Sequence, residues 1–214
     1  MVLSFSAVAL EFKIKGNSLH LSGSFDEQDF DAFHEMMELN EGIDTVILGN
    51  SNGGLTMASY PIGRYIKGNN LKTVIEKDAV CVSSCSFVWL AGGEHRRIED
   101  GGSALFHSSY VPTDAINDII ATKCLEENLD EDETVETCVA FTQDDITDGV
   151  RMVTRQSIAG TVKYMLEMNA PHNLIEQTLS KGPHEFFAVT DINKVGDINN
   201  EELHKLSNKA RGGS

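Results

Sequence analysis

The sequence is short of basic residues. It contains 17 lysines and arginines against 33 aspartates and glutamates among 214 residues, which gives a formal net charge of −16. Nucleic acids and anionic lipid surfaces attract positive charge, so this balance argues against either as a partner. The hydrophobic content of 41% is sufficient for a folded core, and the length fits one α/β domain over residues 1–214.

Long hydrophobic runs are also absent. No stretch approaches the roughly 20 apolar residues that a membrane-spanning helix requires, so we expect no membrane span in this chain. The first nine residues end in a small-x-small pattern similar to a signal cleavage site, but they lack a basic start and a full apolar run. Apolar residues alternate at Leu3, Phe5, Ala7 and Ala9, which favours a first strand over a signal sequence.

Cysteine is scarce, and the four cysteines form two local pairs: Cys81 with Cys85, and Cys124 with Cys138. An even number in a loop-rich, acidic chain is compatible with two disulfides and an extracytoplasmic (periplasmic or secreted) location, with any signal sequence absent or removed. Four reduced thiols are the alternative. Zinc binding by the first pair with His95 and His107 matches no standard ligand spacing, so we expect no metal.

Strand-like and helix-like segments alternate over the first half of the chain. The patterns predict strands at 19–23, 45–48 and 72–76, helices at 26–39 and 56–67, and a further helix that the serine segment at 83–86 opens. Pro61 lies in the early part of the second helix, where proline is tolerated only near the first turn. Such alternation is typical of a mostly parallel sheet with right-handed crossovers.

The pattern changes after His107. Residues 113–143 are strongly acidic and predict an inserted helical arm that solvent surrounds on most faces. A long amphipathic helix is expected at 144–167, followed by a break at Ala170-Pro171-His172 and a second helix at 173–179. Two closing strands are expected at 186–189 and 195–198.

Three separate segments carry the parts of an acyl-transfer site. Gly53-Gly54 follows an apolar run, and glycines let backbone N–H groups approach a substrate closely. Ser83 stands at the start of a predicted helix, where the positive end of the helix dipole lies. His107 closes a third apolar run and is a candidate general base. By residue type alone, Ser84 and Ser86 compete with Ser83, and each motif taken singly is more often structural.

With these three motifs in place, the chain resembles the Clp-protease proteolytic-subunit clan. It is most similar to uncharacterised periplasmic Clp-protease-like proteins with a Cys-x-Ser-x-Cys motif, from about residue 19 to 198 with an interruption at about 112–143. The resemblance implies a Clp/crotonase-like spiral of βαβ units, a homo-oligomer and no cofactor. It selects Ser83 as nucleophile and His107 as general base, with the amides of Gly54 and Ser84 as the oxyanion hole.

The chain departs from this family at two places. Asn52 precedes the glycine pair where the family usually has proline. The family's third triad member is a carboxylate shortly before the last strand, where this sequence has His184 with Glu185 beside it. Glu185 is the first substitute and Asp191 the second, while a Ser–His dyad or an incompetent site are the alternatives. An acid that orients the histidine is worth about 10⁴ in rate.

A different motif overlaps the end of the family match. Residues 191–202 resemble an EF-hand calcium loop, with oxygen donors at loop positions one, three, nine and twelve and glycine at six. Val195 at position five offers no side-chain oxygen, so a turn into a final strand and helix is favoured.

Three functional classes follow. The first is a serine peptidase that hydrolyses peptides or unfolded proteins through a Ser83 acyl-enzyme. The second is a catalytically impaired binding or scaffolding relative of the same fold. The third is a coenzyme-A enzyme of crotonase type, for which the sequence has no nucleotide-recognition motif and which leaves the pairing of Ser83 with His107 unexplained.

Overall fold

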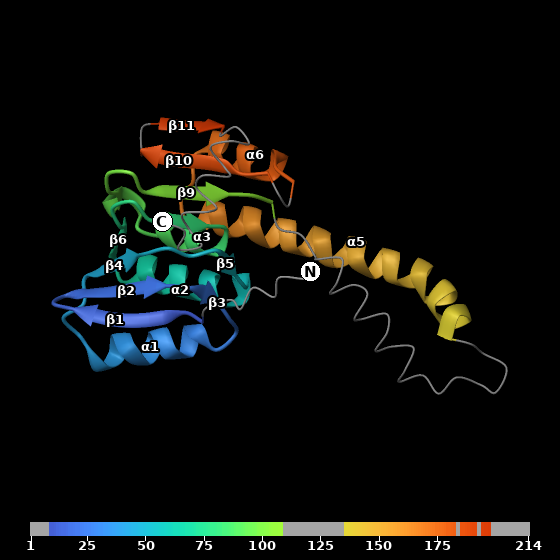
Figure 1. Cartoon of the computed structure of the whole chain (residues 1–214), viewed down its shortest axis with the longest axis horizontal. Helices are drawn as coiled ribbons and strands as arrows, with labels where there is room; N and C mark the ends of the chain where they lie inside the picture. Colours follow the sequence, from blue (N-terminus) through green and yellow to red (C-terminus); the bar gives the residue numbers. More distant parts are fainter. Residues whose placement is uncertain (1–8, 109–134, 183–184, 192–193, 198–214) are drawn as a thin grey trace, which may run out of the picture. The chain divides into compact units, whose positions relative to one another are not determined.

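The structure is a computed structural model, and it describes residues 9–108, 135–182, 185–191 and 194–197 (Figure 1). The chain divides into two compact units, one of residues 1–107 with 164–214 and one of residues 108–163. The first unit is a mixed α/β structure of three sheets with helices between their strands. This confirms the fold class expected from the alternating patterns.

The largest sheet has five strands, in the order β1-β2-β4-β6-β8. Their bounds are β1 Glu11–Lys15, β2 Ser18–Ser22, β4 Thr45–Leu48, β6 Lys72–Ile75 and β8 Arg96–Ile98. β2, β4, β6 and β8 pair in parallel, and only β1 joins antiparallel, to β2. Leu19, Val46, Leu48 and Ile75 are fully buried, because apolar residues on these strands face the core.

Each parallel strand of this sheet is followed by a strand of a second layer. These are β3 (Ser24–Phe25), β5 (Gly53–Gly54), β7 (Val80–Val82) and β9 (Ser103–Phe106). β3 pairs with β5 and β7 with β9, both in parallel, and a bridge between Ser51 and Cys81 links the two pairs. A strand of one layer and then a strand of the other therefore occur four times in succession, which is the expected spiral.

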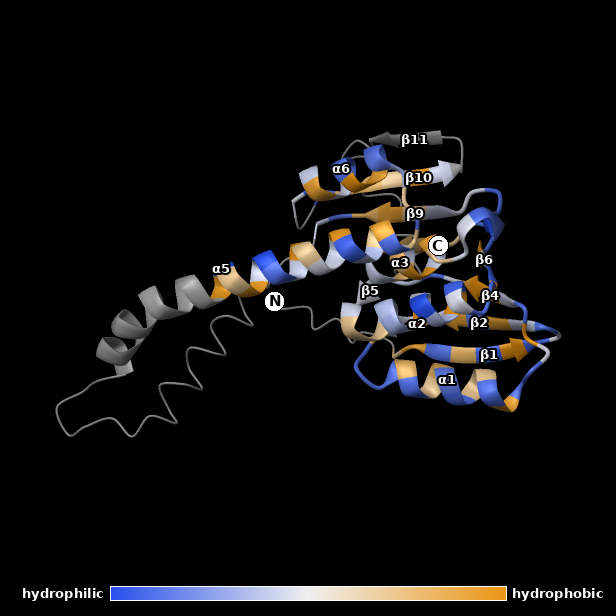
Figure 2. Ribbon diagram, turned by 180° about the vertical axis from the view of Figure 1, so that it is seen from behind, coloured by the Kyte–Doolittle hydropathy of each residue, from blue (hydrophilic) through white to orange (hydrophobic). Residues whose placement is uncertain are grey.

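Three helices connect successive turns of the spiral: α1 (Asp29–Leu39), α2 (Thr56–Gly68) and α3 (Ser84–Leu90), with a short 3₁₀ helix, η1, at Gly93–His95. Hydrophilic and hydrophobic residues alternate along α1 and α2 (Figure 2). α1 begins three residues later than expected, because the Asp26 N–H donates to the Asp29 carboxylate at 2.5 Å in a turn. α2 has nearly the bounds that we expected, and Pro61 lies inside it, in its early part.

The last part of the chain contains α5 (Val135–Glu167), α6 (His172–Ser180) and the hairpin of β10 (Phe187–Asp191) and β11 (Lys194–Asp197). The predicted start of the long helix at residue 144 is wrong, because no proline or glycine interrupts residues 135–143 and they are helical. The remainder of the predicted arm at 113–143, and the predicted strand at 3–9 up to residue 8, lie outside the described residues.

An aromatic cluster fills the core beside α3. Tyr164 stacks on Tyr60 with ring centroids 4.2 Å apart, and Phe87 packs edge-on against Tyr60 at 5.6 Å. The fully buried Tyr164 hydroxyl donates to the Phe87 carbonyl at 2.8 Å. Burial raises the pKa of this hydroxyl well above its ordinary value, so it remains a donor at neutral pH. This bond fixes the end of α5 to α3.

Removing this hydroxyl by Tyr164→Phe is expected to lower the free energy of unfolding by about 1–3 kcal/mol, because the Phe87 carbonyl loses its side-chain donor in the core. Urea denaturation measures the change. Tyr65→Phe, on the half-buried Tyr65 of α2, is the matched control and should change stability by less than about 0.5 kcal/mol. Equal stability of Tyr164→Phe and the unsubstituted protein would show that the bond contributes nothing.

Candidate active site

Ser83 lies at a sharp turn between β7 and α3. Its backbone has φ 52° and ψ −116°, a left-handed φ that costs a non-glycine residue of the order of 1–3 kcal/mol. Two hydrogen bonds hold this conformation: the Ser83 N–H donates to the Leu105 carbonyl at 2.8 Å, and its carbonyl accepts from the Phe87 N–H at 3.2 Å. A serine at a strained strand-to-helix turn is the geometry of a nucleophile elbow.

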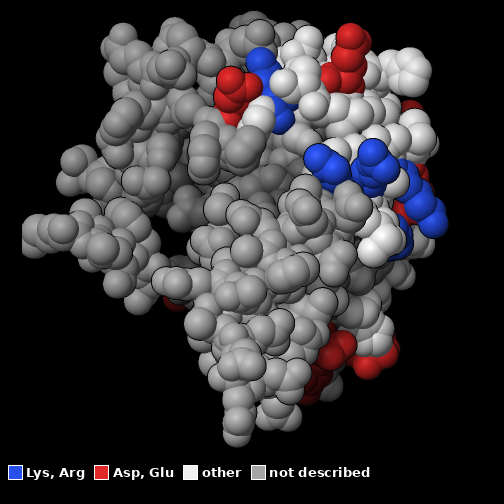
Figure 3. Space-filling view, turned by 90° about the vertical axis from the view of Figure 1, so that its right-hand side faces the viewer, with Lys and Arg blue, Asp and Glu red and all other residues white. Residues whose placement is uncertain are grey.

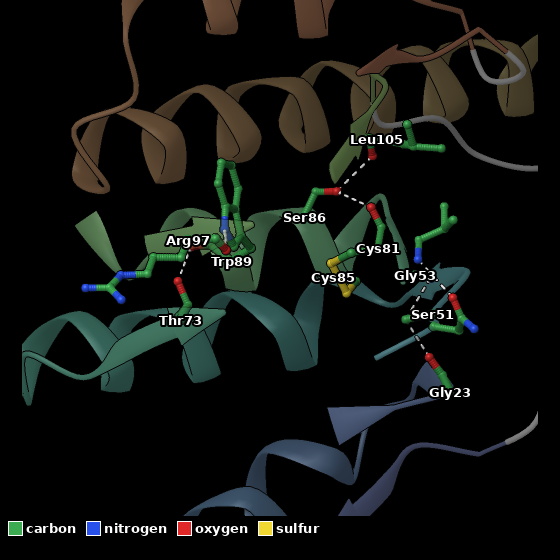
Figure 4. The surroundings of a disulfide bond; sticks show 12 residues. Gly23, Ser51, Gly53, Thr73, Cys81, Cys85, Ser86, Trp89, Arg97 and Leu105 are labelled. Atoms are coloured by element: carbon green, nitrogen blue, oxygen red, sulfur yellow. Dashed lines mark hydrogen bonds between the residues drawn. A yellow bond between two sulfur atoms is a disulfide. The ribbon is translucent and has the colours of Figure 1, made fainter. Parts of the chain in front are cut away.

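The two competing serines have structural roles. The fully buried Ser84 hydroxyl donates to the Gly54 carbonyl at 2.6 Å. Ser86 is also fully buried, and its hydroxyl lies 2.7 Å from the Cys81 carbonyl and 2.9 Å from the Leu105 carbonyl (Figure 4). Ser83 is half-buried. Of the three, Ser83 is therefore the one whose side chain retains access to solvent.

His107 follows the last residue of β9, which pairs in parallel with β7 in the register Val82 to Leu105. Parallel strands end at the same edge of a sheet, so Ser83 and His107 lie at the carboxyl ends of neighbouring strands. His107 is only 9% exposed, and its ring packs edge-on against Phe186 with centroids 5.1 Å apart. The structure thus brings the expected nucleophile and the expected base to one edge.

The glycine pair lies against this edge. A side chain at Gly53 (φ 88°) would place its Cβ 2.7 Å from the Ser83 Cβ, so no residue other than glycine fits without displacement. The Ser51 hydroxyl supports the pair, because it lies 2.5 Å from the Gly23 carbonyl and accepts from the Gly53 N–H at 3.2 Å (Figure 4). The segments expected to supply the two oxyanion donors, Gly54 and Ser84, are joined directly by the Ser84 hydroxyl.

Glu185, the first candidate for the third triad member, precedes β10. The register of β10 with β9 pairs Phe187 with Phe106 antiparallel, which brings Phe186 and Glu185 toward the end of β9 that leads to His107. The Glu185 side chain is exposed, and its carboxylate accepts a hydrogen bond from the Gly182 N–H at 3.1 Å. His184 and the side chain of Asp191 lie outside the described residues.

Cys81 and Cys85 form a disulfide that spans the elbow, with Cα atoms 5.2 Å apart (Figure 4). Cys81 lies in β7 and Cys85 lies in the first turn of α3, and both are buried. The expected bridge of the first pair is confirmed, and the zinc alternative does not fit because both sulfur atoms are bonded to each other. The predicted bridge between Cys124 and Cys138 lies outside the described side chains.

Opening this bridge, by Cys81→Ala with Cys85→Ala or by reduction, is expected to lower the free energy of unfolding by about 2 kcal/mol, because the loop that it closes is short. Guanidinium denaturation with and without reductant measures the loss. The double variant is its own control, since reductant should not alter its unfolding midpoint through this pair. A midpoint of the unsubstituted protein that does not fall when mass spectrometry shows both thiols reduced contradicts the prediction.

Other site types were expected to be absent or were left open. Within the described residues, no group of three or more His, Cys, Asp and Glu side chains is arranged to hold a metal ion. None of the described helices is both long and apolar enough to cross a bilayer. In an EF-hand the calcium loop follows a helix, whereas Asp191 is the last residue of strand β10, so the calcium-loop alternative does not fit. On one face the described residues expose basic as well as acidic side chains (Figure 3).

Comparison with known proteins identifies the fold and no more. No protein-family profile matches the sequence, and no curated protein matches it. Among solved structures, a mutant of ClpP1 from Listeria monocytogenes is similar over 88% of this chain and 95% of its own, with 14% identity and a TM-score of 0.50. A mutant of the 1510-N membrane-bound stomatin-specific protease is 16% identical over 59% of this chain and 69% of its own, with a TM-score of 0.33. The similarity to ClpP1 shows that the fold is Clp-protease-like.

The supporting roles of two hydroxyl groups were not predicted from the sequence. The Ser51 hydroxyl and the Ser84 hydroxyl both bind backbone groups of segments that are about 30 residues away along the chain. A polar residue directly before Gly53-Gly54 was visible in Asn50-Ser51-Asn52, but it does not reveal a partner. Phe186, which packs on His107, was assigned only to a strand.

Proposed function

We propose that this protein is a serine peptidase that hydrolyses peptides or unfolded protein chains through an acyl-enzyme on Ser83. The observation that carries this proposal is the strained backbone of Ser83 at the end of β7, beside the end of β9 where His107 lies. A serine in this conformation presents its hydroxyl away from both the strand and the helix, as nucleophilic attack requires. The fold of the chain is compatible with this chemistry, and the roles below extend it to individual residues.

His107 would accept the Ser83 proton as the hydroxyl attacks the scissile carbonyl, and would return it to the leaving amine. The amides of Gly54 and Ser84 would stabilise the oxyanion, where one lost donor costs about 10²–10³ in rate. Water would then hydrolyse the acyl-enzyme with His107 again as base. All of these steps use groups of the chain itself, so the mechanism needs no cofactor.

The location and the oligomeric state of the protein are part of the same proposal. The buried bridge of Cys81 with Cys85 supports an extracytoplasmic location, because disulfides persist in oxidising compartments. A homo-oligomer is proposed on the resemblance to the Clp-protease clan, and sedimentation or light scattering would report it.

A second candidate function is a binding or scaffolding role without competent catalysis. The geometry of Glu185 favours it, since its exposed carboxylate is bound to the Gly182 N–H. Without a carboxylate that orients His107, a Ser–His pair would be a weak catalyst.

A fluorophosphonate probe separates these candidates. We expect a covalent adduct on Ser83, located by mass spectrometry of tryptic peptides, and cleavage of an unfolded protein substrate that the probe inhibits. A folded protein that forms no adduct and binds unfolded chains without cleaving them would support the scaffolding role. Stabilisation by acyl-coenzyme A in a thermal shift assay would instead favour the crotonase-type enzyme.

A further inference from the structure

We propose that the Ser84 hydroxyl is a positioning group that ties the two oxyanion donors, the amides of Gly54 and Ser84, to each other. The inference rests on the proposed function, because it explains how the same site is held in order. The two donors come from different segments: Gly54 is in β5, and Ser84 is the first residue of α3. An oxyanion hole works only when both N–H groups point at one place.

The hydroxyl of Ser84 fixes one peptide plane next to the first donor. The peptide between Gly54 and Leu55 is held at both ends, since its carbonyl accepts from the Ser84 hydroxyl at 2.6 Å and its N–H donates to the Phe25 carbonyl at 2.9 Å. Ser84 is fully buried, so water does not compete for this hydrogen bond.

The peptide plane on the other side is also fixed. The Gly53 N–H, in the peptide between Asn52 and Gly53, donates to the buried Ser51 hydroxyl at 3.2 Å. The peptide that carries the Gly54 N–H therefore lies between two anchored planes. Glycine has no Cβ to restrict its dihedral angles, so at two consecutive glycines these anchors substitute for the missing steric restraint.

Ser84 consequently has two functions in the same site. Its backbone N–H is one proposed donor, and its side chain sets the orientation of the peptide next to the other. Displacement of α3 relative to β5 would change the spacing of the two donors, and the hydrogen bond of the Ser84 hydroxyl with the Gly54 carbonyl resists it. Loss of the hydroxyl is expected to leave both N–H groups in the chain but to release Gly54 from its orientation.

The test compares Ser84→Ala with Ser86→Ala, a matched control that removes a second fully buried hydroxyl from the same helix. Fluorophosphonate inactivation is measured as a function of probe concentration, which separates the maximal rate from the apparent affinity. We expect Ser84→Ala to lower the maximal inactivation rate of Ser83 by about tenfold or more, with apparent affinity unchanged within about twofold. Ser86→Ala should lower stability without lowering that maximal rate.

An equal maximal rate in Ser84→Ala and the unsubstituted protein would overturn the inference. If Ser84→Ala does not fold, Ser84→Cys, which has a weaker donor of similar shape, should show a smaller loss in the same direction, and an unchanged rate there would also overturn it. Crystal structures give a readout that does not depend on reactivity. The peptide between Gly54 and Leu55 should be rotated in Ser84→Ala, and an unchanged orientation of this peptide would overturn the inference. If the unsubstituted protein never reacts with the probe, the proposed function fails, and the crystal structures still test the tether.

Discussion

Replacing His107 with alanine is expected to lower the rate at which a fluorophosphonate labels Ser83, and the rate of peptide hydrolysis, by about 10³-fold. The ordinary pKa of a serine hydroxyl makes it a weak nucleophile at neutral pH, so its attack depends on a neighbouring base. His107 lies at the end of β9, beside the end of β7 where Ser83 lies. Labelling reactions stopped at a series of times, with the adduct quantified by mass spectrometry, measure the decrease in rate.

The buried position of His107 requires a control for folding. Because its ring packs on Phe186, alanine creates a cavity, so His107→Gln serves as a second variant of closer volume. His95→Ala, which removes an exposed histidine from η1, should label at the rate of the unsubstituted protein. Added imidazole should restore part of the rate to His107→Ala. Full labelling of a folded His107→Gln would remove His107 from the mechanism.

The main framework could be predicted from the sequence because it depends on local patterns. The runs 45–48 and 72–76 are rich in β-branched residues, and both form central parallel strands. The helix that the serine segment opens was also predicted, whereas the strand directly before it, β7, was not. Apolar residues that recur every two residues predict a strand, and those that recur every 3.6 residues predict a helix. The sequence therefore predicts the type of each element and their order along the chain.

The supports of the site could not be predicted, because they depend on contacts between segments that are distant along the chain. The bond from Ser84 to Gly54 spans 30 residues, and its formation depends on how β5 and α3 meet. The start of the long helix expected at residue 144 was wrong for a different reason. Acidic composition indicates solvent exposure, and it does not by itself end a helix. Whether Glu185 can orient His107 also depends on the direction of its side chain, which the spacing of residues along the sequence does not determine.

Gly54→Ala is expected to lower the labelling rate of Ser83 by about 10²-fold or more and the free energy of unfolding by about 3 kcal/mol. An added Cβ would lie 2.2 Å from the Phe25 carbonyl oxygen and 2.7 Å from the Phe25 nitrogen, and φ is 136°. Both neighbours are backbone atoms of β3, which cannot rotate away as a side chain can. The pairing of β3 with β5 must open, and the Gly54 N–H then moves from its proposed oxyanion position.

Gly16→Ala separates this steric effect from backbone strain. Gly16 also has a positive φ, of 61°, but no atom lies within 4 Å of its added Cβ. Its substitution should therefore cost only about 1 kcal/mol of stability and leave labelling unchanged. Urea denaturation and labelling kinetics are measured on both variants. If Gly54→Ala behaves like Gly16→Ala in both measurements, β3 and β5 do not approach each other as described, and the Gly54 amide has no defined place beside Ser83.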